Sequence, residues 1–196
     1  MPDFHRKPNR LGPESYVGRH AYFLTLCANE RRKILANAAL VESLVPVLRT
    51  TCESHSFNVN AYCFMPDHLH LVVMGESDSA SLPRFMQAFK SLAARETATL
   101  GIAKPWQKGF YDHVLGDGES IDATALYAFL NPVRAGLVRR VEEWPYSGSF
   151  MFAWPNVPVV STAFVPAWKK EVQAEPKKEQ DGEVNSPLQT GRKMAR

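Results

Sequence analysis

The sequence is poor in the residues that cross-link small secreted proteins, and it has no stretch that fits a membrane. Its three cysteines, Cys27, Cys52 and Cys63, form no CxxC pair and no even set, so a disulfide framework is not expected. The longest apolar runs are far too short to span a bilayer. Residues 1–16 are polar and lack the apolar core of a signal peptide. We therefore expect reduced, buried cysteines, no membrane partner and a cytoplasmic protein.

A large excess of charge of one sign is also missing. The net charge is +3 over 196 residues, which is too small to indicate a nucleic-acid partner by itself. The first 33 residues are richer in basic than in acidic side chains: Arg6, Lys7, Arg10, Arg19, Arg31, Arg32 and Lys33 against Asp3, Glu14 and Glu30. Basic arms of this kind often contact phosphates, and a solvated leader has the same composition. The sequence leaves both interpretations open.

What is present predicts one globular α+β domain. Apolar residues make up 45% of the chain, enough for a substantial core. Apolar periodicity predicts four strands and two long helices, in the order β-α-β-β-α-β: strands at 21–27, 57–65, 68–74 and 110–115, and helices at 37–55 and 82–100. Asn37 and Ser81 are the expected helix caps, and Pro46 is expected to kink the first helix or shift its start. This order is typical of a ferredoxin-like antiparallel sheet.

The rest of the chain is expected to add helices and tails to that domain. We predict a third helix at 121–131, a fourth from Pro132 to about residue 143, and an end of regular structure at Trp144-Pro145-Tyr146. The domain is expected to span 18–150 and to follow a basic, flexible leader at 1–17. Residues 151–168, apolar and broken by prolines, are expected to wrap it as extended chain. The charged stretch 169–196 is expected to be disordered.

Two histidines stand two residues apart on the strand that follows the Pro66-Asp67 turn. Side chains alternate across a strand, so His68 and His70 share one face while Leu69 and Leu71 share the other. Two imidazoles on one face can hold one divalent cation. They can equally be ordinary core or surface histidines, and the spacing alone does not decide between the two.

A tyrosine and an amide are four residues apart on the predicted third helix. Tyr127 and Asn131 therefore lie on one edge of that helix, whereas Leu126, Phe129, Leu130 and Val133 form the apolar face. Near two imidazoles, a phenol and an amide oxygen would provide a nucleophile and a further ligand. Tyr127 can also be an ordinary amphipathic residue, and Asn131 before Pro132 is also typical of a helix N-cap.

Four separated blocks, in order and spacing, resemble the single-tyrosine HUH transposases, and within them the REP-associated tyrosine transposases. The blocks are MPDHLHLVV, WQKGFYDHVL, YAFLNPVRAGLV and WPYSGS, and the similarity covers roughly residues 18–150. The resemblance implies that His68 and His70 bind a divalent metal, Mg²⁺ or Mn²⁺, that Asn131 is the third ligand, and that Tyr127 is the nucleophile.

The same resemblance implies a function on DNA. It predicts an endonuclease and strand transferase that cuts single-stranded DNA at hairpin-forming repeats through a 5′-phosphotyrosine, working as a monomer or homodimer. A free phenol has a pKa of about 10, so a cation that polarises the phosphate would assist the attack. The alternatives are a hairpin-binding relative that does not cut and a metal hydrolase of a small substrate. Tyr111 is a competing nucleophile, although its strand position beside Asp112 favours a structural role, and His113 is a weaker candidate for the outer shell of the metal.

Because the net charge is small, DNA binding is expected to depend on local basic clusters. The candidates are Arg31, Arg32 and Lys33 after the first strand, Arg84 and Lys90 on the second helix, Lys104 and Lys108 in the connector, and Arg134. Trp106 lies between the connector lysines and could stack on an unpaired base, although a core position is more usual for tryptophan.

Overall fold

The computed structural model describes residues 12–152 of the 196. The described strands are β1 (Ala21–Cys27), β2 (Phe57–Met65), β3 (His68–Gly75), β4 (Tyr111–Val114) and β5 (Ser147–Gly148). The α-helices are α1 (Ala38–His55), α2 (Leu82–Thr99), α3 (Ile121–Phe129) and the short α4 (Asn131–Arg134). Four 3₁₀ turns complete the described part: η1 (Pro13–Tyr16), η2 (Asn29–Arg31), η3 (Ile34–Ala36) and η4 (Val141–Glu143).

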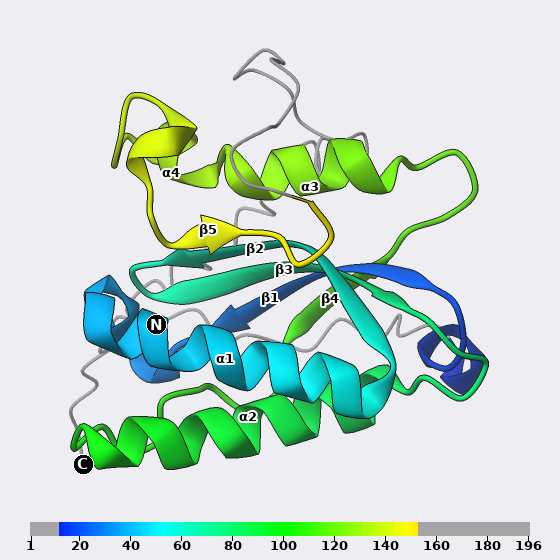
Figure 1. The fold of residues 1–196 in the computed structure, drawn as a ribbon, viewed down its shortest axis with the longest axis horizontal. Helices are drawn as coiled ribbons and strands as arrows, with labels where there is room; N and C mark the ends of the chain where they lie inside the picture. The colour runs from blue at the N-terminus through cyan, green and yellow to red at the C-terminus, as the bar shows by residue number, and fades with distance from the viewer. Residues whose placement is uncertain (1–11, 153–196) are drawn as a thin grey trace, which may run out of the picture. The chain divides into compact units, whose positions relative to one another are not determined.

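The strands form one five-stranded sheet in the order β4-β1-β3-β2-β5 (Figure 1). All of its pairings are antiparallel, and β2 and β3 join through the tight turn at Pro66-Asp67. The first four strands with α1 and α2 give the β-α-β-β-α-β arrangement. The prediction of an α+β, ferredoxin-like antiparallel sheet is therefore confirmed.

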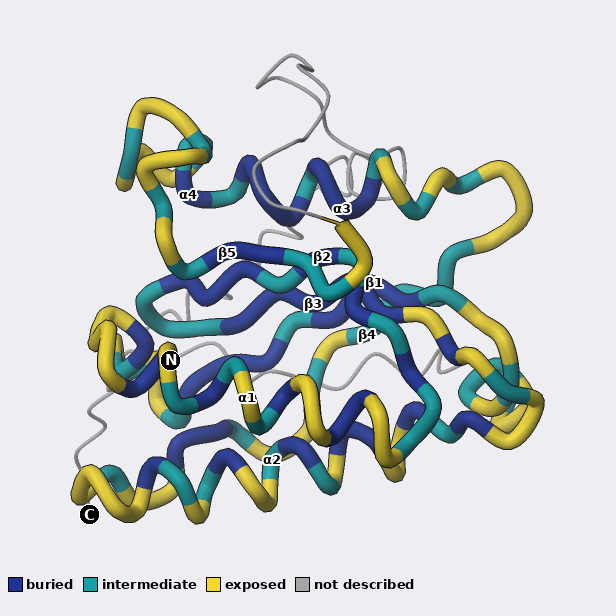
Figure 2. Tube along the Cα trace, in the orientation of Figure 1, coloured by how far each residue is buried: buried dark blue, intermediate teal, exposed yellow. Residues whose placement is uncertain are grey.

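The main core lies between the sheet and the helices α1 and α2, which cover the same face (Figures 1 and 2). Alternation along β3 directs Leu69, Leu71 and Val73 into this core, where each has an exposed fraction of 0%. Burying one such side chain contributes about 1.5–3 kcal/mol. The α1 and α2 face therefore stabilises the fold, and the opposite face of β3 is left for other residues.

The opposite face of the sheet is covered by α3, beside β2 and β3 (Figure 1). This helix buries Leu126 and Phe129, and Leu130 just beyond its end is buried as well. The predicted apolar face of the helix is confirmed at these three positions. Because Leu69 and Leu71 face the main core, His68 and His70 lie on the side of the sheet that α3 covers.

Three expectations differ from the structure. The fourth helix does not reach residue 143, because Gly136 at φ +67° follows α4 and ends it after one turn. Regular structure continues past Tyr146, since Ser147–Gly148 pairs with β2 as an edge strand. Pro46 does not shift the start of α1, which runs from its cap at Asn37 through the proline to His55.

Several other expectations fall partly or wholly outside the described residues. They concern the leader at 1–17, the wrapping segment at 151–168 and the tail at 169–196, of which 1–11 and 153–196 are not described. Within residues 12–152, none of the helices is both long and apolar enough to cross a membrane.

The two long helices offer a matched test of capping. The Asn37 side chain accepts a hydrogen bond from Leu40 N at 3.2 Å, whereas Ser81 makes no side-chain cap bond. We expect Asn37→Ala to lower the free energy of unfolding by about 1 kcal/mol, and Ser81→Ala to lower it by less. Urea denaturation of both variants measures this. Equal losses would show that the Asn37 hydrogen bond is not what stabilises the start of α1.

Candidate functional site

The two histidines lie on the α3 side of the sheet, at the start of β3. In the strand register His70 lies between Thr25 of β1 and Cys63 of β2. His70 is buried, with an exposed fraction of 7%, and the His68 side chain retains 19%. The predicted alternation is confirmed, since the residue between them, Leu69, faces the main core on the other side.

The two imidazoles face each other through their Nε2 atoms. His68 Nε2 and His70 Nε2 are 3.0 Å apart, and the rings are nearly perpendicular, at 81°. Each Nδ1 has a partner of its own: Asp67 Oδ1 lies 2.6 Å from His68 Nδ1, and Thr25 Oγ1 lies 3.0 Å from His70 Nδ1. Both rings are therefore held at one nitrogen and directed toward a common point by the other.

The partner atoms indicate which nitrogens carry hydrogen. A carboxylate only accepts, so His68 Nδ1 donates to Asp67, and the neutral His68 ring then has a lone pair on Nε2. A hydroxyl accepts or donates, so Thr25 Oγ1 can accept a hydrogen bond from His70 Nδ1, which leaves His70 Nε2 with a lone pair as well. Two facing lone pairs at this distance repel each other unless a proton or a cation lies between them. This arrangement of donors suits a metal ion.

The separation of the nitrogens also fits a metal. In octahedral coordination, two neighbouring ligand atoms form an angle of about 90° at the ion. If each is about 2.1 Å from the ion, they lie about 3.0 Å apart. Cys63, beside His70 in the strand register, is fully buried, and burial raises the pKa of its thiol to about 12. No group of three or more His, Cys, Asp or Glu side chains within residues 12–152 is placed to hold an ion. A third protein ligand from this region would have to be another residue type, such as an amide.

The carboxylate of Asp67 is itself held in place. Arg31 Nη1 donates to its second oxygen, Oδ2, at 3.3 Å. Burial raises the pKa of Asp67, but the hydrogen bond from His68 and the nearby Arg31 guanidinium lower it, and the net shift is downward. Asp67 thus stays ionised as an acceptor for His68.

The tyrosine of α3 lies one aromatic ring away from the histidines. The ring of Phe23, on β1, has its centroid 5.2 Å from that of His70 and 5.7 Å from that of Tyr127. Phe23 is buried, with an exposed fraction of 2%, so it fixes the spacing between them. The structure thus brings Tyr127, which is half-buried, to the same side of the sheet as His68 and His70.

The end of α3 is built around Pro132. Proline has no N–H, so the helical donor for the Ala128 carbonyl is missing. Asn131 Nδ2 replaces it, donating to Ala128 O and to Tyr127 O at 3.1 Å each. The N-cap position of α4 is occupied by Leu130. The alternative in which Asn131 caps the fourth helix is therefore not what the structure has, because the Asn131 amide donates backward to α3.

Arg134 reinforces the same end of α3. Its Nη2 donates to Tyr127 O at 2.6 Å, and its Cζ lies 3.9 Å from the centre of the Tyr127 ring. Burial lowers the pKa of Arg134, although its contacts with Tyr127 oppose the shift. Because Asn131 Nδ2 faces the carbonyls, the amide oxygen on the other side of its planar group points away from them. Tyr127 is thus held through its carbonyl and its ring.

The model of the family described as "Transposase IS200 like" matches residues 16–127. This match covers more than half of the chain. It contains both histidines and ends at Tyr127. The chain belongs to the IS200-like transposase family.

Two relatives and one solved structure are similar to this chain. A Haemophilus influenzae protein assigned as a REP-associated tyrosine transposase is 28% identical over 141 residues, covering 64% of this chain and 77% of the relative. The REP-associated tyrosine transposase of Escherichia coli K12 is 25% identical over 136 residues, covering 67% of this chain and 78% of the relative. A solved REP-associated tyrosine transposase bound to a REP hairpin shares the fold, with a TM-score of 0.60 at 22% identity and coverage of 72% and 81% of the two chains.

The basic residues expected on this transposase-family chain fall into two groups. Four donate to acceptors within the protein: Arg31 to Asp67, Arg32 to Ala103 O and Lys104 O, Lys90 to Gln107 O and Gly109 O, and Arg134 to Tyr127 O. The others have exposed side chains: Lys33, Arg84, Lys104 and Lys108. The sequence could not separate the two groups, because most of the acceptors are carbonyls or carboxylates distant along the chain.

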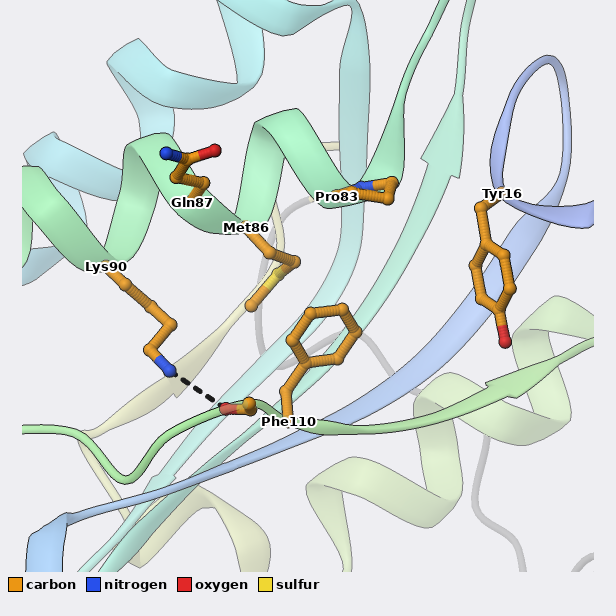
Figure 3. A pocket seen from close by; sticks show the side chains of 7 residues that line it. Tyr16, Pro83, Met86, Gln87, Lys90 and Phe110 are labelled. Carbon is orange, nitrogen blue, oxygen red and sulfur yellow. Dashed lines mark hydrogen bonds between the residues drawn. The ribbon is translucent and has the colours of Figure 1, made fainter. Parts of the chain in front are cut away.

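Lys90 and Trp106 are two predicted DNA contacts whose side chains are instead engaged within the protein. Lys90 crosses from α2 to the connector, where its ammonium meets the Gly109 carbonyl beside a cavity lined by Met86 and Phe110 (Figure 3). Burial lowers the pKa of Lys90. Trp106 retains only 8% exposure and belongs to the core, the position that is more usual for tryptophan.

The remaining aromatic and histidine candidates lie on β4. Tyr111 is opposite Thr25 in the register and is 46% exposed, and its partial burial raises the pKa of its phenol. His113 Nε2 contacts both carboxylate oxygens of Glu119, at 3.0 and 2.9 Å. His113 thus joins β4 to the loop before α3.

The sequence analysis did not identify Asp67 and Thr25 as site residues. Only the adjacency of Asp67 to His68 could have suggested one of them.

The contribution of the Arg134 hydrogen bond to the Tyr127 carbonyl can be tested by measuring the free energy of unfolding. A hydrogen bond to a charged group contributes about 1.5–3 kcal/mol, so we expect Arg134→Ala to lower the free energy of unfolding by an amount of that order. The matched control is Arg139→Ala, an exposed arginine nearby, with an expected change within about 0.5 kcal/mol. Urea denaturation compares them. Indistinguishable values would mean that Arg134 does not stabilise the end of α3.

Proposed function

We propose that this protein is a metal-dependent endonuclease and strand transferase for single-stranded DNA, which cleaves at hairpin-forming repeats through Tyr127. The observation that carries the proposal is the pair of imidazole Nε2 atoms 3.0 Å apart, on the side of the sheet covered by the tyrosine helix. Membership of the IS200-like transposase family supports it. A metal-dependent hydrolase of a small substrate would have no use for Tyr127.

Three residues would hold the metal. His68 and His70 would bind through Nε2, and Asn131 through its amide oxygen. Bound Mg²⁺ or Mn²⁺ would withdraw charge from a nonbridging phosphate oxygen and stabilise the charge that develops during transfer. Asp67 and Thr25 keep the ring nitrogens directed at that point. Nitrogen and oxygen donors of this kind bind several divalent ions, and availability favours Mg²⁺ or Mn²⁺.

Tyr127 would carry the covalent step. Its Oη forms a bond to phosphorus as the bond from phosphorus to the 3′ oxygen breaks, and the phenol proton ends on that oxygen. The products are a 5′-phosphotyrosine and a free 3′-hydroxyl, so the phosphodiester energy is retained for rejoining. Capping of the Tyr127 carbonyl by Asn131 and Arg134 limits the motion of the helix end that presents the phenol.

The proposed substrate is a hairpin of single-stranded DNA. The relative of known structure is bound to a REP hairpin, and this chain shares its fold. The exposed side chains of Lys33, Arg84, Lys104 and Lys108 are proposed as phosphate contacts. Arg31, Arg32, Lys90 and Arg134 would need to exchange internal acceptors for phosphate to take the same role.

A covalent adduct is the direct test of this function. The purified protein is incubated with Mn²⁺ and labelled single-stranded repeat hairpins, and a denaturing gel shows whether label migrates with protein. We expect Tyr127→Phe to lose the adduct and to keep DNA affinity, since only a hydroxyl is removed. Tyr111→Phe is the matched control and should retain the adduct.

Other results would overturn parts of the proposal. Hairpin binding without an adduct in the unaltered protein would indicate a binding protein that does not cleave. An adduct that persists in Tyr127→Phe and disappears in Tyr111→Phe would move the nucleophile to β4.

Asn131 can be tested by separating its nitrogen from its oxygen. Asn131→Asp keeps an oxygen ligand but loses the two donated hydrogen bonds, whereas Asn131→Ala loses both functions. We therefore expect both variants to be less stable, and only Asn131→Ala to bind Mn²⁺ more weakly. Titration calorimetry and urea denaturation measure the two properties. If Asn131→Ala bound Mn²⁺ as tightly as the unaltered protein, Asn131 would be a structural residue alone.

A further inference from the structure

A chain of contacts leads from an exposed arginine to a proposed metal ligand. Arg31 Nη1 donates to Asp67 Oδ2 at 3.3 Å, and the other oxygen of the same carboxylate, Oδ1, receives His68 Nδ1 at 2.6 Å. The carboxylate therefore connects the guanidinium to the imidazole. Its rotation is restricted from both sides, because each oxygen has a different partner.

The loop between β1 and α1 is shaped to make this contact. Glu30 and Arg31 both adopt φ of +55°, a left-handed backbone conformation that residues other than glycine rarely adopt. Two adjacent residues in this region are unfavourable unless the surroundings hold them. Arg31 N closes the turn by donating to Ala28 O at 3.0 Å. The strained turn directs the Arg31 side chain toward Asp67.

Backbone hydrogen bonds from the same loop hold the turn that carries the histidines. Ala28 N donates to Asp67 O at 2.9 Å, and Leu35 N donates to Pro66 O at 3.0 Å. Both carbonyls of the Pro66-Asp67 turn are thus fixed by residues 28–35. The position of His68, the next residue, follows from this attachment.

The second histidine is oriented from the same part of the chain. Thr25 lies near the end of β1, opposite His70 in the register, and its hydroxyl is 3.0 Å from His70 Nδ1. Each imidazole therefore has an outer partner, and both partners depend on β1 and the loop that follows it. Outer partners of this kind fix ring orientation and raise the basicity of the ligand nitrogen.

We propose that Arg31, Asp67 and Thr25 are positioning residues that set the metal affinity of the histidine pair, and that Arg31 serves the metal site instead of contacting DNA phosphate. This inference rests on the metal site of the proposed function. The Arg31–Asp67 ion pair is too exposed to add much folding stability, with side-chain exposures of 46% and 29%. Its loss should therefore change metal binding and leave stability nearly unchanged.

The test is calorimetric titration of the full chain with Mn²⁺ alone, in the absence of DNA. We expect Asp67→Ala to weaken Mn²⁺ binding by about 10- to 100-fold, and Thr25→Val to weaken it in the same direction. Asp67→Asn, which keeps an acceptor without the charge, should lie between Asp67→Ala and the unaltered protein. It also provides the measurement if Asp67→Ala does not fold.

Arg31→Gln is the deciding variant, with Lys33→Gln as its matched control. Lys33 lies two residues further along the same loop and is exposed. We expect Arg31→Gln to weaken Mn²⁺ binding by less than Asp67→Ala does, Arg31→Lys to restore part of the loss, and Lys33→Gln to leave the affinity unchanged. The salt dependence of hairpin binding should be unchanged in Arg31→Gln, since no phosphate contact is removed.

Two results would overturn the inference, and they differ from failure of the metal site itself. Unchanged Mn²⁺ affinity in both Asp67→Asn and Arg31→Gln, with binding lost in His68→Ala, would reject the positioning role and keep the metal site. An unchanged affinity in Arg31→Gln together with a salt slope reduced by about one unit would assign Arg31 to a phosphate. Unchanged affinity in His68→Ala as well would reject both the inference and the proposed metal site.

Discussion

The facing pair of imidazole nitrogens is the constraint on which the site depends. Two Nε2 atoms are held 3.0 Å apart although neutral rings with outward Nδ1 hydrogens would repel there. That geometry requires two residues on one face of a strand, a tight turn immediately before them, and a fixed partner for each outer nitrogen. The opposite face of the same strand is occupied by core residues, which hold β3 in this orientation. The burial of Leu69 and Leu71 therefore supports the site as well as the fold.

The Asn-Pro sequence at the end of α3 is the second constraint. Pro132 removes a backbone donor, and the side chain of Asn131 replaces it. Arg134 then holds the Tyr127 carbonyl and covers its ring. The short motif thus combines three functions that a regular helix would separate: it ends α3, it fixes the tyrosine, and it turns the amide oxygen away from the helix carbonyls.

The basic residues show why net charge is a poor guide to a DNA surface. Half of the expected DNA-binding cations donate to carbonyls or carboxylates within the protein, and the rest are exposed on the loops and α2. A guanidinium bound to three carbonyls, like that of Arg32, organises a loop. The same group on a free side chain would contribute to phosphate binding. Composition cannot distinguish the two cases, because both require the same residue type.

By itself, the sequence determined the properties that depend on neighbouring residues. The period of two in β3 placed His68 and His70 on one face, the period of helices placed Leu126 and Phe129 inward, and the order of elements predicted the sheet. It also predicted the long helices and the Asn37 cap.

Only the tertiary structure decided the partners of the site residues. Thr25 is 45 residues from His70 and Arg31 is 36 residues from Asp67, and each pair meets through strand register or a loop conformation. It also decided that Asn131 donates backward and that α4 ends after one turn. The physical reason is that a hydrogen bond depends on which donor and acceptor meet in space, and local periodicity contains no information about residues so far apart.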